Sequence, residues 1–258
     1  MIIKVVNPNT TASMTRLIEA SARTAAGPGT GVIAVGSAMG PASIESHYDE
    51  ALSVPGLLAE ITGGQPADGY VIACFGDPGL DAAREVASGP VVGIAEAAMR
   101  AAGYLGRSFS VVTTLARTAG RAYELADRYG VRAYCRNVRA CEVPVLELDT
   151  DPKARARIAE ECRAALEVDG AEVIVLGCAG MADLCAELGA ELGVPVVDGV
   201  AAAVAAVEGL VRLGLTTSRA GEYARPPDKR YTGALEGFGR IREPDPRPPL
   251  RARSKAER

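Results

Sequence analysis

The sequence predicts an α/β fold in which two pseudo-symmetric lobes carry mostly parallel sheets and enclose a cleft. Short runs rich in Val and Ile alternate with longer segments in which apolar residues recur every three or four positions, a pattern typical of β/α units. Hydrophobic residues make up 48% of the chain and aromatic residues only 4%, so small aliphatic side chains must fill the core. Similar features recur in both halves of the chain, which indicates two related lobes.

Seven short apolar runs predict strands, because they are too short for helices and rich in β-branched residues. They lie at residues 2–6, 32–35, 70–74, 91–94, 109–112, 173–176 and 194–197. The segments between them carry apolar residues on one helical face, as Met14, Leu17 and Ile18 do in the first. These segments predict helices at residues 11–26, 45–61, 115–129, 152–168 and 200–213. Strands and helices therefore alternate, as parallel sheets require.

The two halves follow one plan. Residues 5–11, VVNPNTT, and residues 111–115, VVTTL, are both strand ends that continue into hydroxyl-rich helix starts. Cys74 lies 68 residues after Val6 (74 − 6) and Cys178 lies 66 residues after Val112 (178 − 112), so each cysteine ends the corresponding strand of its half.

Domain boundaries follow from this repeat. We expect Rossmann-like lobes at residues 1–104 and 105–239, with a C-terminal helix or strand able to cross back to the first lobe. Residues 240–258 are charged and Pro-rich, and are expected to form a flexible tail.

Charge and patterning exclude several classes of function. The net charge is −4, so nothing favours binding to nucleic acid or to an acidic membrane surface. No secretory signal and no apolar run of about 18 residues is visible, so a cytoplasmic protein with free thiols is expected. A metal site is not expected, because the chain has no C-x-x-C motif and His47 is its single histidine. Cys162 and Cys185 lie in helical segments and are expected in the core, and Cys135 and Cys141 carry no assigned chemistry.

Two cysteines stand where apolar strands open into glycine-containing loops: Cys74 in VIACFGDPGL and Cys178 in VIVLGCAGM. Ligands of parallel sheets bind beyond the carboxyl ends of the strands, so both thiols should face the cleft, one from each lobe. The helix N-termini that follow should lower the pKa of both thiols. Packing at a strand end would explain either cysteine alone, but a matching pair favours chemistry. Opposed thiols suit racemisation, since one removes a proton from one face of a carbon and the other returns a proton to the opposite face.

No pyridoxal or metal motif is apparent, so no cofactor is expected and hydrogen-bond donors must stabilise the carbanion. The candidate substrate-binding residues lie in the loops around the two cysteines and their partner strands: Asn7, Asn9, Thr10, Gly76, Asp77, Thr113, Thr114, Ala179 and Gly180. Asn9 fits either a helix N-cap or a ligand contact, and Asp77 fits either an Asp-Pro turn or a loop-orienting role. His47 fits a surface helix start or the entrance of the cleft, and Arg117 a solvated helix face.

Six motifs resemble those of the hydantoin and allantoin racemases of the aspartate/glutamate racemase superfamily. They are NPNTT (7–11), PASIESHYDEAL (41–52), ACFGDPGLDAARE (73–85), GIAEAAM (93–99), GCAGM (177–181) and PVVDGV (195–200). The resemblance spans nearly the whole chain, and the combination of ACFGDPG with GCAGM is its specific part. It implies a cofactor-independent, homo-oligomeric racemase with Cys74 and Cys178 as the acid/base pair and the NPNTT and TTL loops as substrate contacts.

The composition of the candidate loops bears on the substrate. They contain no Lys or Arg, which favours a neutral cyclic ureide over a free amino acid, whose charged groups would each need a partner. Hydantoins with an alkyl or aryl group at C5 rank slightly above allantoin, which carries a polar ureido group there. The alternatives are an amino-acid racemase of the Asp/Glu type, a decarboxylase or cis–trans isomerase of related architecture, and a non-enzymatic small-molecule binding protein.

Overall fold

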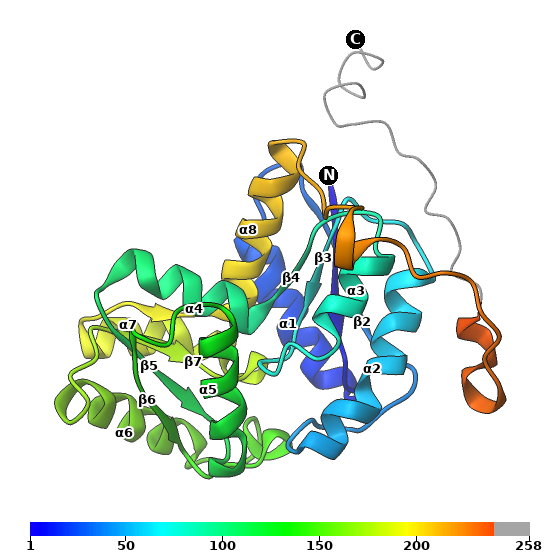
Figure 1. Ribbon diagram of the computed structural model, residues 1–258. Coiled ribbons are helices and arrows are strands. Elements are labelled where there is room, and N and C mark those ends of the chain that lie inside the picture. The colour runs from blue at the N-terminus through cyan, green and yellow to red at the C-terminus, as the bar shows by residue number, and fades with distance from the viewer. Residues whose placement is uncertain (240–258) are drawn as a thin grey trace.

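The computed structural model describes residues 1–239 and consists of two α/β lobes, one blue to cyan and the other green to yellow (Figure 1). Each lobe is built on a four-stranded parallel sheet flanked by helices. This arrangement confirms the predicted fold class. The tail predicted at residues 240–258 lies outside the described residues.

The strands of the two sheets correspond one to one. Their bounds are β1 (Ile2–Asn7), β2 (Gly31–Gly36), β3 (Gly69–Ile72), β4 (Val91–Gly93), β5 (Phe109–Thr113), β6 (Cys135–Ala140), β7 (Val173–Leu176) and β8 (Val196–Val197). The strand order is β2-β1-β3-β4 in the N-terminal lobe and β6-β5-β7-β8 in the C-terminal lobe. Every pairing is parallel. The second sheet therefore repeats the first, with β1, β3 and β4 matched by β5, β7 and β8.

Strand β6 was not predicted, and its sequence explains why. It reads CRNVRA and lies at a sheet edge, where only Cys135 and Val138 are buried and the other positions can be polar. A search for continuous apolar runs finds the inner strands β3 and β7, which are buried along their whole length, and passes over such an edge.

The helices connect successive strands. They are α1 (Ala12–Ala25), α2 (His47–Thr62), α3 (Leu80–Val86), α4 (Ile94–Leu105), α5 (Ala119–Arg128), α6 (Ala154–Glu167), α7 (Cys185–Leu192) and α8 (Gly199–Arg212), with short 3-10 helices η1 (Ala116–Thr118) and η3 (Ala179–Leu184) near the C-terminal sheet. The predicted helices omit α3 and α4. The first has only two turns, and the second begins directly after β4, so no loop separates the strand pattern from the helix pattern.

The two lobes exchange a helix. Helix α4 packs against β5 and β7 of the C-terminal sheet, whereas α8 returns to the N-terminal lobe and packs against α1, β3 and β4 (Figure 1). A side chain at Gly69 would place its Cβ 2.3 Å from Val207, so glycine permits the close approach of β3 and α8. The exchange gives the lobes a shared core, which fixes their relative position.

Small aliphatic side chains dominate the interior, as the composition predicts. Fully buried residues such as Ala98, Val111 and Leu125 belong to one cluster that spans both lobes. Cys162 and Cys185 lie in a second cluster beneath the C-terminal sheet, which confirms their predicted core positions. None of the helices within residues 1–239 combines the length and apolarity that crossing a membrane requires.

Candidate active site

Cys74 and Cys178 occupy equivalent turns. Cys74 lies just beyond β3 and Cys178 just beyond β7, so each leaves the inner strand of its sheet at the carboxyl end. The carbonyl of Cys74 accepts a hydrogen bond from the N–H of Asp77 (3.0 Å), and the carbonyl of Cys178 accepts one from Met181 (3.1 Å). The sequence repeat therefore corresponds to a repeat of backbone geometry.

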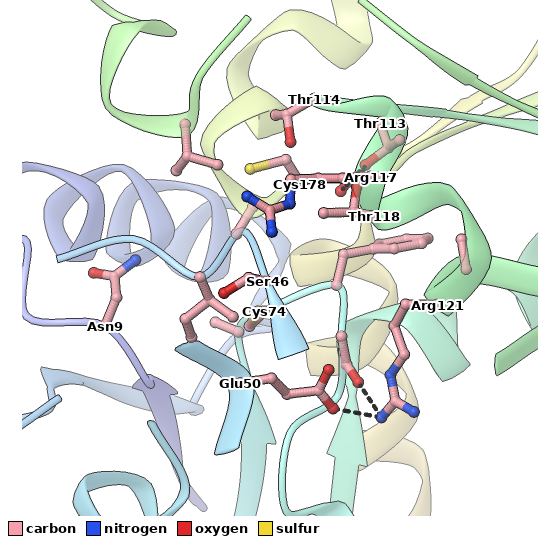
Figure 2. Close-up of a pocket in the computed structure, with 18 of the residues that line it drawn as sticks. Asn9, Ser46, Glu50, Cys74, Thr113, Thr114, Arg117, Thr118, Arg121 and Cys178 are labelled. Atoms are coloured by element: carbon pink, nitrogen blue, oxygen red, sulfur yellow. Dashed lines mark hydrogen bonds and ion pairs between the residues drawn. The ribbon is translucent and has the colours of Figure 1, made fainter. Parts of the chain in front are cut away.

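A single cavity of about 200 Å³ lies between the lobes and contains both cysteines in its wall (Figure 2). The N-terminal lobe contributes Asn9, Met14, Ile44, Ser46, His47, Glu50, Ala73, Cys74, Phe75 and Gly76, and the C-terminal lobe contributes Thr113, Thr114, Arg117, Thr118, Arg121, Ala122, Val145, Gly177, Cys178 and Ala179. The two thiols, both partly exposed, thus face the same cavity from different lobes.

Enclosure determines the protonation of the thiols. Desolvation raises the pKa of both Cys74 and Cys178 from 9.0 to about 12, although each sulfur accepts a hydrogen bond from the N–H two residues on, at Gly76 and Gly180. The expectation of a lowered pKa was therefore wrong. Helix α3 begins only at Leu80 and Cys178 is followed by a 3-10 turn, so neither thiol lies at the N-terminus of a long helix. A negative charge on Cys178 would raise the pKa of Cys74 further, which disfavours two thiolates at once.

The NPNTT loop is held together by its own side chains. Asn7 is fully buried and donates from Nδ2 to Asn9 Oδ1 (2.8 Å) and to Thr15 Oγ1 (3.0 Å). Asn9 Oδ1 also accepts from the N–H of Thr11 (2.9 Å), and Thr11 rather than Asn9 is the N-cap of α1. Of the three residues predicted to contact substrate here, Asn9 lines the cavity, Asn7 lies beneath it, and Thr10 is exposed outside it.

The remaining predicted contacts divide in the same way. Thr113, Thr114, Gly76 and Ala179 line the cavity. Asp77 is only 1% exposed and lies behind Cys74.

Gly180 lies behind Cys178, where an added Cβ would meet Leu148 at 3.0 Å and Met14 at 3.4 Å. Its N–H reaches the thiol of Cys178, so this glycine acts on the cavity through its backbone.

Helices contribute a polar wall to the cavity, of which only His47 was foreseen, as one of its two alternatives. Glu50 and His47 come from α2, and Arg121 comes from α5. Arg121 Nη2 forms an ion pair with Glu50 (2.7 Å) and donates to the carbonyl of Gly76 (3.0 Å), as the dashed lines in Figure 2 show. Burial raises the pKa of Glu50, and the charge of Arg121 opposes that rise.

Arg117 also lines the cavity. The sequence predicted a solvated helix face, and this residue is indeed exposed in η1, but the prediction omitted that it borders the cavity. Its guanidinium extends towards the space between the labelled cysteines in Figure 2, and it forms no hydrogen bond or ion pair with any residue of the range 1–239. Arg117 follows Thr114 by three residues, so including the first helical turn after each strand-end loop in the search would have found it.

Residues 1–239 contain no group of three or more His, Cys, Asp or Glu side chains arranged to hold a metal ion. Cys135 and Cys141, like the two core cysteines, are buried away from the cavity. Within the described chain, thiol chemistry in the cavity is therefore restricted to Cys74 and Cys178.

Comparison with known proteins identifies the family. Residues 3–207 match the model of the Asp/Glu/Hydantoin racemase family. The chain belongs to this family. The family consists of racemases, so the protein is an isomerase, and its substrate is a small molecule.

Three relatives are similar over almost their full length. The hydantoin racemase of Pseudomonas sp. (strain NS671) is 50% identical over 243 residues, covering 93% of this chain and 98% of the relative. The allantoin racemase of Klebsiella pneumoniae is 49% identical with a TM-score of 0.90, and the match covers 92% of this racemase and 98% of that chain. The allantoin racemase of Pseudomonas fluorescens is 42% identical with a TM-score of 0.87, covering 90% and 100%.

Proposed function

We propose that this racemase interconverts the D and L forms of 5-substituted hydantoins, with Cys74 and Cys178 as the two acid/base residues. The observation that carries the proposal is the presence of two cysteines in equivalent turns of two related lobes, both lining one cavity. A carbon bound in that cavity meets a sulfur from each lobe. This arrangement supports chemistry that treats the two faces of a planar intermediate alike.

The proposed reaction begins with one cysteine as thiolate and the other as thiol. The thiolate takes the C5 proton of the substrate, and the electron pair of the C–H bond passes into the adjacent carbonyl to form an enolate. The opposite thiol then gives its proton to the other face of C5 and becomes the thiolate. The proton count is unchanged, and the reverse reaction uses the same groups in exchanged roles. Repulsion between two thiolates disfavours the doubly ionised pair, so the reactive form carries one proton on the pair. Because burial raises both pKa values to about 12, this form is a minor fraction of the enzyme near neutral pH.

The enolate needs stabilisation, and the C-terminal wall of the cavity offers it. Arg117 presents a cation without a protein partner in residues 1–239, and the hydroxyl-bearing side chains of Thr113 and Thr114 line the same wall. Arg117 is solvent-exposed at the edge of the cavity, and a guanidinium directed at a developing oxyanion stabilises its negative charge. These groups support a reaction in which charge moves onto a carbonyl oxygen.

The cavity walls bear on the C5 substituent. Apolar side chains, namely Met14, Ile44, Phe75, Ala122 and Val145, suit an alkyl or aryl group. The similarity to the hydantoin racemase of Pseudomonas sp. (strain NS671) supports this choice.

Allantoin is a second candidate, since it is a hydantoin with a ureido group at C5. The polar wall of Ser46, His47 and Glu50, together with Arg117, matches the donors and acceptors of that group. The similarity to two allantoin racemases also favours it. The absence of basic residues from the loops alone does not decide the substrate, because η1 and α5 bring Arg117 and Arg121 to the cavity.

A polarimetric assay with three substrates tests the proposal. L-5-benzylhydantoin, (S)-allantoin and L-glutamate are incubated separately with the enzyme, and the optical rotation of each is followed. We expect at least one ureide to lose its rotation and glutamate to keep it. Turnover of glutamate with both ureides unchanged would overturn the proposal, and the ratio of the two ureide rates ranks hydantoin against allantoin.

A further inference from the structure

Asp77 has a backbone conformation that its surroundings impose. Its φ is 45°, in the left-handed region that side chains other than Gly rarely adopt. The residue closes the turn that begins at Cys74, and only 1% of its surface is exposed. Such a conformation costs about 1 kcal/mol or more and persists when neighbouring contacts hold it.

Those contacts come from two other elements. The carboxylate of Asp77 accepts hydrogen bonds from the N–H groups of Ala95 (3.1 Å) and Glu96 (2.9 Å) at the start of α4. It also accepts one from the hydroxyl of Tyr129 (2.6 Å), the residue that ends α5. An added Cβ on Gly93 would lie 2.2 Å from the carboxylate, so glycine is needed there to leave room for Asp77.

The second anchor comes from the other end of α5. Arg121, in the first turn of that helix, donates to the carbonyl of Gly76 (3.0 Å) and pairs with Glu50 (2.7 Å). One helix of the C-terminal lobe thus holds two successive residues of the Cys74 loop, Gly76 and Asp77, at points near its two ends.

The Cys178 loop is held by different contacts. Gly180 packs against the apolar ends of Leu148 and Met14, and Met181 is fully buried. In the described part of the chain, no charged side chain hydrogen-bonds to residues 178–181. The helix equivalent to α4 is α8, and it is capped by its own Asp198, which accepts from the N–H of Val200 (2.7 Å). The polar anchoring is therefore confined to one of two otherwise equivalent loops.

We infer that Asp77 and Tyr129 are positioning residues that act on Cys74 and not on Cys178. The hydroxyl of Tyr129 fixes the carboxylate, the carboxylate fixes the turn, and the turn sets where the Cys74 sulfur meets the substrate. This inference rests on the proposed two-thiol mechanism, because it assigns Asp77 and Tyr129 to the half-reaction in which Cys74 transfers the proton. A displacement of a reacting group by about 1 Å can lower a rate by about 100-fold, so loss of one anchor is sufficient to be measured.

Hydrogen–deuterium exchange at C5 separates the two half-reactions. Tyr129→Phe is made in two backgrounds. In Cys178→Ser the cavity retains the thiol of Cys74 alone, and in Cys74→Ser it retains the thiol of Cys178 alone. Exchange into each enantiomer is followed by NMR in deuterated water. We expect Tyr129→Phe to slow exchange through Cys74 by about tenfold or more and to leave exchange through Cys178 within about twofold. Equal slowing in both backgrounds, or no slowing through Cys74, would overturn the inference.

A matched control is available on the same helix. The hydroxyl of Tyr123 donates to Asn137 (2.8 Å) and accepts from the N–H of Val138 (3.0 Å), both in β6. Tyr123→Phe removes the same atom from α5 without touching the Cys74 loop. Tyr123→Phe should leave the ratio of exchange through Cys74 to exchange through Cys178 unchanged. Thermal unfolding of both Phe variants shows whether the fold is intact.

A chemical measurement separates failure of this inference from failure of the proposed mechanism. Iodoacetamide labelling of the otherwise wild-type protein is followed at each cysteine by peptide mass spectrometry, with no substrate present. Tyr129→Phe should accelerate labelling of Cys74 several-fold relative to Cys178, since the loosened turn exposes the thiol. An unchanged ratio would overturn the anchoring. If neither single-cysteine variant exchanges the C5 proton but the labelling ratio changes, the positional effect stands and the two-thiol mechanism fails.

Discussion

Burial of the two cavity thiols predicts how slowly iodoacetamide should inactivate the enzyme. The pKa of each rises from 9.0 to about 12, so below about pH 9 the thiolate fraction is about 1,000-fold lower than that of an unperturbed thiol. A thiolate of higher pKa is intrinsically more nucleophilic. With a Brønsted coefficient of about 0.4–0.5, a rise of about three pKa units makes each thiolate about 15- to 30-fold more reactive, which offsets part of the lower thiolate fraction. Inactivation should therefore be slower than alkylation of a free cysteine derivative at the same pH by about one to two orders of magnitude.

The assay measures the inactivation rate constant between about pH 7 and about pH 10, with N-acetylcysteine as the reference thiol. We expect the logarithm of the rate to rise by about one for each pH unit over this whole range, because both thiols remain mostly protonated. Excess substrate should protect the enzyme. Cys162→Ala should be as sensitive as the wild type, since Cys162 is fully buried outside the cavity.

Two results would refute this reasoning. A rate that reaches a plateau below about pH 9 would mean that at least one thiol ionises normally and that desolvation does not dominate its environment. Loss of activity with label only on Cys135 or Cys141 would mean that the reactive thiols have been assigned to the wrong residues.

Three further changes have defined outcomes. Cys74→Ser and Cys178→Ser should each abolish net racemisation in polarimetry while keeping the fold, because a serine hydroxyl is far too weak an acid to replace the thiol; full racemisation by either variant would contradict the two-thiol mechanism. Arg117→Met should lower kcat/KM for (S)-allantoin about tenfold more than for L-5-benzylhydantoin, and Arg117→Lys should restore part of the difference, whereas equal losses would show that Arg117 does not contact the substituent. Burial raises the pKa of Asp77 from 3.8 to about 6, so its contribution to stability is fully present below about pH 4 and falls by about 3 kcal/mol as pH rises through about 6. Urea titrations should show the wild type losing more unfolding free energy than Asp77→Asn across that window, and parallel curves would contradict the assignment.

Local pattern was sufficient to predict the elements that are buried on every side. The apolar runs of β3 and β7 end beside Cys74 and Cys178, and the carboxyl ends of parallel strands always meet at one edge of a sheet. The pair of thiols at the cleft could therefore be predicted from residue order alone. The edge strand β6 could not, because solvent on one side permits the polar residues that hide its pattern.

The polar wall of the cavity could not be predicted from the sequence, because its residues lie far apart along the chain. Glu50 and Arg121 are 71 positions apart (121 − 50), yet they form an ion pair at the cavity wall because α2 and α5 converge there. Arg117 is exposed, and nothing local to it shows that it also borders the cavity, because that depends on which elements lie opposite it. The substrate preference inferred from loop composition alone was incomplete for this reason.

The two-lobed α/β fold, its internal repeat and the matching contexts of the two cysteines were predictable from the residues alone, since each depends on short-range periodicity and on strand ends. The protonation of those cysteines and the asymmetry between them became visible in the folded structure. The pKa of a thiol depends on how far its surroundings exclude water, and the walls of this cavity come from both lobes. The anchoring of Cys74 likewise depends on Tyr129, 55 residues further along the chain (129 − 74), which reaches Asp77 because the fold places the end of α5 beside the start of α4.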